Sequence, residues 1–146
     1  MAYKTRYIPV NASKYIGDPT TIICRSLWER KVCKWLDSNI NVIRWGSEEV
    51  IIPYISPKDN KKHKYYPDFI AEVQSIDDTV ETLLIEVKPK KQTKCPTNKK
   101  KSRNAINEMS TYRINTSKWD AARIFCKMQG WKFVILTEDH LFPKNK

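Results

Sequence analysis

The feature that most constrains the fold is a pair of short apolar segments that carry charged side chains. In the segment Ile85–Lys88 apolar and charged residues alternate, so a strand would place Glu86 and Lys88 on one face. A carboxylate and an ammonium group among apolar neighbours are costly to bury unless both have partners. The second segment is Tyr65–Phe69, in which Asp68 follows a proline at the expected entrance of another strand.

The spacing of the acidic residues favours a shared site. Asp68 precedes Glu86 by 18 residues, which suits two strands of a hairpin joined by a turn within 72–81. Neighbouring strands lie about 4.8 Å apart, so the two carboxylates can share one cation. Mg²⁺ takes oxygen ligands at about 2.1 Å and keeps water and substrate phosphate in its other positions. The alternative is structural: Glu86 and Lys88 form an ordinary surface ion pair, and Asp68 caps a turn.

The functional interpretation gives each group a task in phosphodiester hydrolysis. A metal ion between the carboxylates would polarise the phosphate and lower the pKa of a bound water molecule. Lys88 would orient that water and offset the charge that builds in the transition state. The sequence therefore predicts in-line hydrolysis without a covalent enzyme intermediate.

A third carboxylate, Glu29, lies on a helix predicted over residues 26–39. Ser26 is a good N-cap, and Glu29 stands three residues later, as in a capping box. At 100° per residue Glu29 also falls inside the apolar arc of the helix, which favours an inward direction and a place at the metal site. Both roles stay open. The arc consists of Trp28, Val32, Cys33, Trp35 and Leu36, and the opposite face carries Arg30, Lys31, Lys34 and Asp37.

The charge of the chain favours a polyanionic substrate. Among 146 residues, 27 Lys and Arg stand against 16 Asp and Glu, for a formal net charge of +11. Each phosphate contact of such a protein releases counterions. Residues 88–103 hold no acidic residue, which favours a track for phosphate groups over a merely solvated loop. The side chains expected to bind nucleic acid there are Lys90, Lys91, Lys94, Lys99, Lys100, Lys101 and Arg103.

Length and composition predict one domain over 1–146, with 1–25 as an irregular N-terminal arm. A chain of this size can bury a core without disulfide bonds, and 40% apolar residues favour a packed globule. No apolar run approaches the roughly 20 residues that cross a bilayer, and the N-terminus lacks the apolar stretch of a signal peptide. The four cysteines form no CxxC pair, which favours reduced thiols inside a cell.

Hydrophobic periodicity predicts a mixed α/β fold, with a single central sheet flanked by helices. A helix is expected over 118–129, capped by Ser117 and ended by Gly130, and a shorter one near 102–112. These helices would follow the helix over 26–39. The expected strands cover residues 40–45, 50–55, 65–73, 82–88 and 131–137.

Several of these motifs together resemble a known superfamily. Pro67-Asp68 followed by Glu86-Val87-Lys88 resembles the PD-(D/E)xK signature of the restriction-endonuclease-like nucleases. The segment Ser26–Arg30 resembles the helical glutamate that many members place before the sheet. The tail, Lys118–Arg123 with Gly130–Glu138, is similar to the TnsA-type transposon end-cleaving endonucleases and to the small head-completion nucleases of T-even-like tailed phages.

This resemblance implies an αβββαβ core, dependence on Mg²⁺ or Mn²⁺, and DNA strand cleavage. The chain ends at Lys146 without the additional C-terminal domain of the transposon enzymes, which favours the phage head-completion nucleases. The catalytic set that the resemblance implies is Glu29, Asp68, Glu86 and Lys88, with Asp68, Glu86, the backbone carbonyl of Val87 and Glu29 at the metal. Lys118 matches a lysine of the TnsA-like pattern and is expected to bind nucleic acid.

The resulting expectation is a single-domain, Mg²⁺-dependent DNA endonuclease of phage head completion. Its expected partners are DNA and phage portal or neck proteins, without a membrane and without a small-molecule cofactor. Its expected location is the cytoplasm of the host cell, or the virion. Two alternatives remain: a non-catalytic basic DNA-binding or virion-assembly protein on a nuclease scaffold, and a Holliday-junction-type resolvase, which shares the motif and acts as a dimer.

Overall fold

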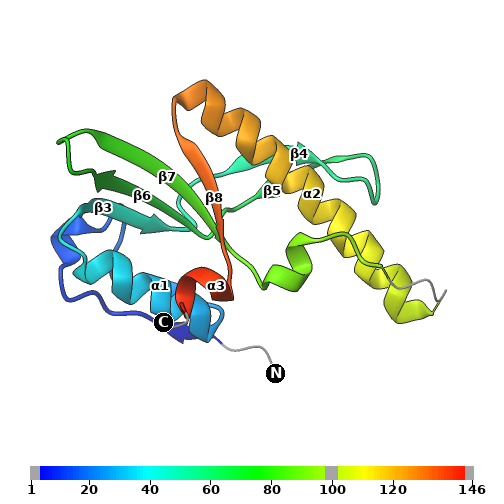
Figure 1. Ribbon diagram of the computed structural model, residues 1–146, viewed down its shortest axis with the longest axis horizontal. Helices are drawn as coiled ribbons and strands as arrows, with labels where there is room; N and C mark the ends of the chain where they lie inside the picture. Colours follow the sequence, from blue (N-terminus) through cyan, green and yellow to red (C-terminus); the bar gives the residue numbers. More distant parts are fainter. Residues whose placement is uncertain (1–3, 98–101, 144–146) are drawn as a thin grey trace.

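A four-stranded mixed sheet forms the centre of the computed structural model, which describes residues 4–97 and 102–143. Its strand order is β3-β6-β7-β8, with antiparallel pairing from β3 to β7 and parallel pairing between β7 and β8 (Figure 1). The parallel pair requires a crossover, which a long helix between β7 and β8 supplies. The strands are β3 (Val42–Ser47), β6 (Phe69–Gln74), β7 (Val80–Val87) and β8 (Lys132–Leu136).

Two helices cover opposite faces of this sheet. Helix α1 (Leu27–Ser38) packs on the face that carries Phe69 and Ile85, and helix α2 (Arg103–Gln129) packs on the face that carries Leu84. The order α1-β3-β6-β7-α2-β8 confirms the predicted αβββαβ core and the mixed central sheet. The remaining helical elements are short: η1 (Ala12–Lys14), η2 (Lys90–Thr93) and α3 (Glu138–Leu141).

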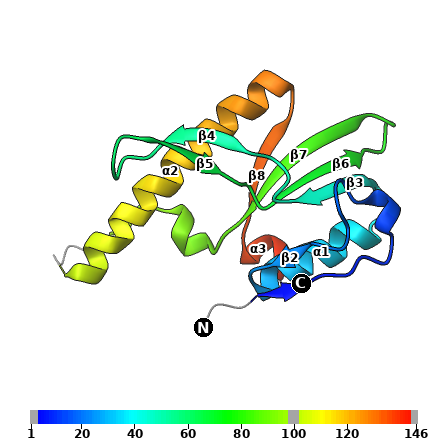
Figure 2. The same ribbon diagram turned by 180° about the vertical axis from the view of Figure 1, so that it is seen from behind.

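A hairpin is inserted between β3 and β6 and lies outside the central sheet. Its strands are β4 (Ile52–Ile55) and β5 (Lys62–Tyr65), which among the described residues pair only with each other and run beside α2 (Figure 2). The prediction that residues 50–55 form a strand of the single central sheet was wrong, because β4 lies in a separate two-stranded sheet. Ile52 and Tyr54 are apolar because they face α2, not because they lie within the sheet.

Helix α2 is continuous over 27 residues, so the predicted break at Ser117 was wrong. Its N-cap is Ser102, whose hydroxyl accepts a hydrogen bond from the backbone N–H of Ala105 at 3.1 Å. Within the helix, the Thr116 hydroxyl donates to the Tyr112 carbonyl at 2.8 Å, so a side chain suited to a cap is satisfied in mid-helix. Gly130 ends the helix as predicted, with a φ of 75° in the left-handed region.

The N-terminal segment contains the short strands β1 (Thr5–Arg6) and β2 (Ile23–Cys24) and contributes Tyr7 to the core beside Trp45. It is held by Asp37, whose carboxylate accepts the Tyr7 hydroxyl at 2.8 Å and the backbone N–H of Val10 at 2.7 Å. The prediction of Asp37 on a polar face was therefore wrong. Trp35, predicted within the apolar arc of α1, is 51% exposed.

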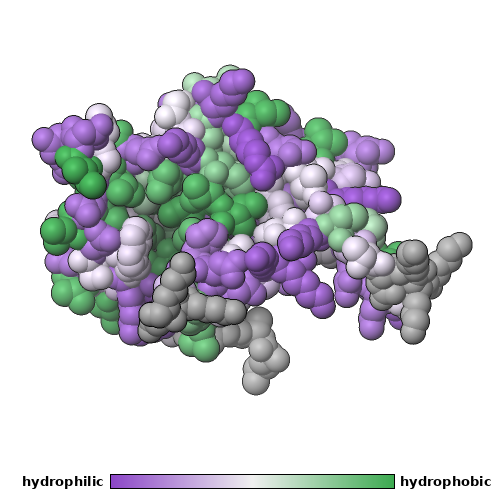
Figure 3. Space-filling view, in the orientation of Figure 1, coloured by the Kyte–Doolittle hydropathy of each residue, from purple (hydrophilic) through white to green (hydrophobic). Residues whose placement is uncertain are grey.

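The surface in the view of Figure 3 is divided by polarity. Apolar residues gather over β7 and β8, and polar residues surround them, including the side where α2 and the β4–β5 hairpin lie. Within the described residues, no helix combines the length and the hydropathy needed to traverse a bilayer.

Candidate active site

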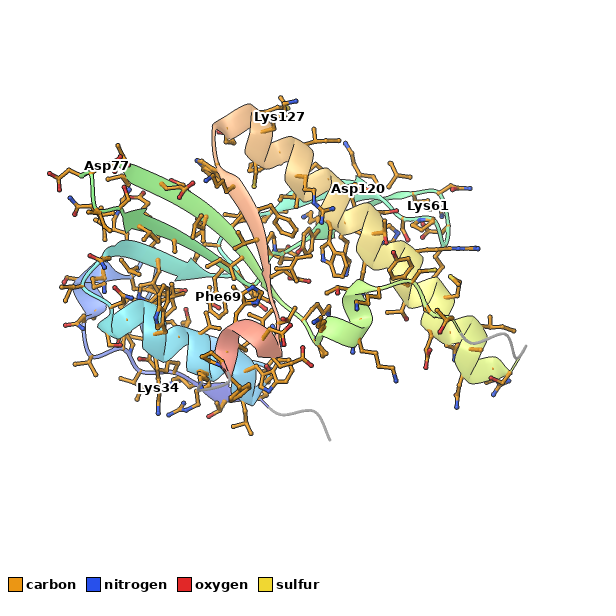
Figure 4. The ribbon with its side chains drawn as sticks, in the orientation of Figure 1. Lys34, Lys61, Phe69, Asp77, Asp120 and Lys127 are labelled. Carbon is orange, nitrogen blue, oxygen red and sulfur yellow. The ribbon has the colours of Figure 1, made fainter. Side chains whose placement is uncertain are left out.

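The β6–β7 hairpin brings Asp68 and Glu86 opposite each other. Phe69 pairs with Ile85 in the antiparallel register, and one further step toward the open end aligns Asp68 with Glu86. The backbone N–H of Val87 donates to Asp68 Oδ2 at 2.7 Å. In Figure 4, Phe69 marks this central end of the hairpin, and Asp77 marks the turn at its far end. The expected hairpin pairing of the two carboxylates is therefore present.

Both carboxylates lie on the α2 side of the sheet, in a site of concentrated negative charge. Glu86 is only 5% exposed. Burial raises the pKa of Asp68 well above its usual value, and the charges of Glu86 and Glu29 raise it further. The hydrogen bond from Val87 opposes this rise in the pKa of Asp68. Among residues 4–97 and 102–143, no ion pair involves Asp68 or Glu86.

Two buried side chains beside Glu86 were not predicted from the sequence. The indole Nε1 of Trp119, on α2, donates to Glu86 Oε2 at 3.3 Å. The buried hydroxyl of Tyr65 makes no hydrogen bond within the described residues, and burial together with the Glu86 charge raises its pKa. Tyr65 stands three residues before Asp68, so its place in the Tyr65–Phe69 motif was the available signal. Trp119 gave no local signal because α2 folds back from a distant part of the chain.

Lys118 joins the same region from α2. Its Nζ lies 5.7 Å from the ring centroid of Tyr65 and 5.9 Å from that of Tyr54. Lys88 follows directly after β7 and is partly exposed, and its backbone N–H donates to the Leu136 carbonyl at 3.0 Å. That bond extends the β7–β8 pairing to the position of the predicted catalytic lysine.

Glu29 approaches from the other side, at the first turn of α1. The Ser26 hydroxyl accepts the backbone N–H of Glu29 at 3.0 Å, and Glu29 Oε1 accepts the backbone N–H of Arg25 at 3.2 Å. Burial raises the pKa of Glu29, and the Arg25 N–H and guanidinium oppose that rise, whereas the charges of Glu48 and Glu86 add to it. Glu29 thus serves the helix N-terminus and also adds charge to the site.

These groups can be tested for their fit to a divalent cation. Two buried carboxylates without a cationic partner are the oxygen ligands that Mg²⁺ prefers, and a bound cation would remove their mutual repulsion. Glu29 does not complete the set, because within the described residues no three His, Cys, Asp or Glu side chains are grouped closely enough to hold a metal ion. The pair Asp68 and Glu86 therefore fits an ion that keeps water or substrate oxygens in its remaining positions.

The basic side chains after β7 differ in their contacts, since Lys90 forms an ion pair and others are exposed to solvent. Lys90 Nζ pairs with Asp139 at 2.9 Å, and its backbone N–H donates to Glu138 at 2.6 Å. Lys91 and Lys94 line a groove of about 810 Å³ against the first half of α2. Arg103 begins α2 and is exposed. The predicted contacts Lys99, Lys100 and Lys101 lie outside the described residues.

Comparison with known proteins gives two matches. A family model described as the TnsA-like endonuclease N-terminal domain matches residues 39–138, which include Asp68, Glu86 and Lys88 but begin after Glu29. The chain is also 41% identical over 146 residues to the head completion nuclease of Enterobacteria phage T4, with 97% of this chain and 95% of the relative covered. No solved structure matches.

Proposed function

The chain belongs to the TnsA-like endonuclease N-terminal family, and on that premise we propose that it is a DNA endonuclease of phage head completion whose cleavage requires Mg²⁺ or Mn²⁺. The observation that carries this proposal is the pairing of Asp68 with Glu86 at the open end of the β6–β7 hairpin, buried and without a cationic partner among the described residues. The family supports cleavage of DNA, and the phage relative supports the role in head completion.

The residues of the site have separate tasks in the proposed reaction. Asp68 and Glu86 would hold the ion, with the Val87 carbonyl as a third oxygen ligand. When bound, the ion would polarise the scissile phosphate and lower the pKa of a coordinated water molecule. Lys88 would orient that water and offset negative charge in the transition state. The Val87 N–H and the Trp119 indole restrict the orientations of the two carboxylates by hydrogen bonding.

Plasmid nicking tests the assignment of Asp68 and Lys88. Supercoiled plasmid is incubated with the protein and Mg²⁺, Mn²⁺ or EDTA. We expect Asp68→Asn and Lys88→Met each to lower the nicking rate by about 100-fold or more. Asp68→Asn removes a carboxylate that would hold the ion, and Lys88→Met removes the ammonium group that would offset charge in the transition state. EDTA should abolish nicking by the parent protein.

Matched controls separate this loss from a general effect of charge. Asp77→Asn changes an aspartate at the opposite end of the same hairpin, and Lys34→Met changes an exposed lysine on α1. Both should nick at the parental rate. Nicking by Asp68→Asn and Lys88→Met at the parental rate would overturn the catalytic assignment and leave a DNA-binding protein on a nuclease scaffold.

Trp119 is proposed as a positioning residue. Trp119→Phe keeps an aromatic ring but removes the Nε1–H that donates to Glu86. Loss of such an outer hydrogen bond typically costs 10- to 100-fold in metal affinity, so we expect the Mg²⁺ concentration for half-maximal nicking to rise by about that factor. The rate at saturating Mg²⁺ should stay near the parental value. Trp131→Phe, which alters a tryptophan packed against Phe125, is the control. An unchanged Mg²⁺ requirement in Trp119→Phe would contradict the positioning role.

The biological part of the proposal concerns place and partners. Head completion would bring the protein from the host cytoplasm to the portal or neck of filled heads. If cleavage is the required activity, phage that encode Asp68→Asn should accumulate filled heads without tails, visible by electron microscopy, although the variant protein is present at the normal level. Normal phage yield with Asp68→Asn would favour a purely structural role in assembly.

A further inference from the structure

The β4–β5 hairpin is inserted between β3 and β6 and is not part of the αβββαβ core. It pairs with no strand of the central sheet among the described residues. An isolated two-stranded hairpin is marginally stable in water, so packing on a helix is needed to hold it. Ile52 and Tyr65 provide this packing, since they belong to the same buried cluster as Trp119 and Ala122 of α2. The hairpin is therefore a supported arm beside the candidate site.

The arm carries an excess of positive charge that the described residues do not neutralise. The turn and β5 contain four exposed lysines and one acidic residue, Asp59. The Asp59 carboxylate is already engaged, by His63 Nε2 at 2.9 Å and by the backbone N–H of Lys61 at 3.0 Å. Within residues 4–97 and 102–143 none of the four ammonium groups makes an ion pair. The four lysines are Lys58, Lys61, Lys62 and Lys64.

Strand alternation gives two of these lysines a common direction. In the hairpin register Tyr54 pairs with His63, and Ile52 pairs with Tyr65 on the face that packs against α2. Lys62 and Lys64 occupy the alternate positions, so they point to the opposite face. Residues two apart on a strand are separated by about 6.6 Å. The outer face of the arm thus presents a short row of cations.

The covalent connection limits how far this row can lie from the carboxylates. Strand β5 leads into Asp68 through only Tyr66 and Pro67. Since an extended chain spans at most about 3.6 Å per residue, the Lys64 Cα lies within about 14 Å of the Asp68 Cα, and the Lys61 Cα within about 25 Å. In duplex DNA 25 Å corresponds to roughly seven base pairs. Figure 4 shows Lys61 on the arm, on the side of the molecule away from Asp77.

We propose that the β4–β5 hairpin is a DNA-binding arm that contacts the phosphate backbone of a duplex flank through Lys62 and Lys64. The inference rests on the proposed function, because it takes DNA as the substrate of the neighbouring site. The arm would hold the duplex on one side of the cut, at phosphates within about seven base pairs of the cleaved bond. Free ammonium groups in a row and a polyanion are complementary in charge, and contacts to phosphate carry no base preference.

The test compares two charge-matched double variants in DNA binding. Lys62→Gln/Lys64→Gln removes two charges from the arm, and Lys34→Gln/Lys127→Gln removes two exposed charges from α1 and from the far end of α2. Binding of a fluorescent 30-base-pair duplex is measured by anisotropy in EDTA over a series of salt concentrations. The slope of log K against log salt is about −0.9 per phosphate contact, so the arm variant should lose about 1.8 of slope and the control should lose almost none.

Charge reversal provides a second measurement. Lys62→Glu/Lys64→Glu should weaken binding beyond the glutamine variant, while thermal unfolding of all variants stays close to that of the parent because these side chains are exposed. A parental slope in the glutamine variant, or an equal loss of slope in the arm and control variants, would overturn the proposal.

Nicking assays on the same proteins keep this proposal distinct from the proposed function. If the parent fails to nick plasmid but the arm variant still loses slope, the arm is supported and the endonuclease assignment fails. If the parent nicks plasmid and the arm variant binds and nicks as the parent does, the arm is rejected and the endonuclease assignment stands. With both supported, the arm variant should nick more slowly at high salt than the α1/α2 control does.

Discussion

At the scale of single residues, Asp68 makes the metal-free protein sensitive to pH. Its pKa is raised in the folded chain by burial and by neighbouring carboxylates. Below the usual pKa of aspartate, Asp68 is protonated in both the folded and the unfolded chain, and no stability is lost. As the pH rises, the unfolded chain releases its proton first, and stability falls until the pH passes the raised pKa of the folded state. Each unit of difference corresponds to about 1.4 kcal/mol.

Asp68→Asn should therefore stabilise the protein in EDTA at pH 7.5, because the variant has no carboxylate to ionise inside the site. Near pH 4 the two proteins should unfold at almost the same urea concentration. Adding Mg²⁺ should raise the unfolding free energy of the parent and leave that of the variant nearly unchanged, since the ion binds the folded parent. Urea unfolding followed by circular dichroism measures all three effects.

Asp77 is the control for this prediction because its pKa shifts the other way. Hydrogen bonds from Ser75 and Thr79 lower the pKa of Asp77 to about 2, so its ionised form is favoured in the folded state. Asp77→Asn should bring no gain in stability at pH 7.5. A parent that is more stable than Asp68→Asn in EDTA at pH 7.5 would show that the carboxylates are not in the strained ionised state inferred from their burial.

At the scale of elements, the N-terminal segment depends on one buried side chain of α1. Asp37 is 1% exposed and accepts hydrogen bonds from the Tyr7 hydroxyl and from the backbone N–H groups of Val10 and Asn11. Asp37→Ala would leave these donors without their acceptor in a buried setting. A buried donor that loses its acceptor costs about 1–3 kcal/mol, and we expect a total loss of roughly 2–4 kcal/mol.

Urea unfolding measures this loss, and Asp120→Ala is its control. Asp120 lies on α2 with a 64% exposed side chain and pairs with Arg123 at 3.3 Å. An exposed pair of this kind contributes little, so the control should change stability by less than about 1 kcal/mol. Equal effects of the two substitutions would contradict the anchoring role of Asp37.

Elements were predicted best where the signal is local. The alternation around Glu86 identified β7, and the proline before Asp68 marked the entrance of β6, because side-chain period and proline geometry act within a few residues. The single strand predicted over 65–73 was wrong at its start, because Tyr65 belongs to β5. Ser117 was misleading because a hydroxyl residue is favoured at a cap but is also accommodated inside a helix. The neighbouring Thr116 shows this, since its hydroxyl donates to the Tyr112 carbonyl within α2.

At the scale of the whole molecule, packing between distant segments escaped prediction. Trp119 reaches Glu86 only because α2 crosses the sheet, and Asp37 is buried only because the N-terminal segment closes over α1. The β4–β5 hairpin was missed because β5 is polar along most of its length, with Tyr65 as its single buried residue. These three features depend on contacts between segments that are distant in the sequence, and hydrophobic periodicity within one segment does not encode such contacts.

The parallel pairing of β7 with β8 has a consequence for when the site can form during synthesis. Glu86 pairs in register with Ile135, some fifty residues later in the chain, and α2 must fold between them. A nascent polypeptide that has emerged only as far as Lys88 holds both acidic side chains but has neither the adjoining strand nor the covering helix. Ribosome-bound protein should therefore not cleave nearby DNA until translation of almost the whole chain is finished.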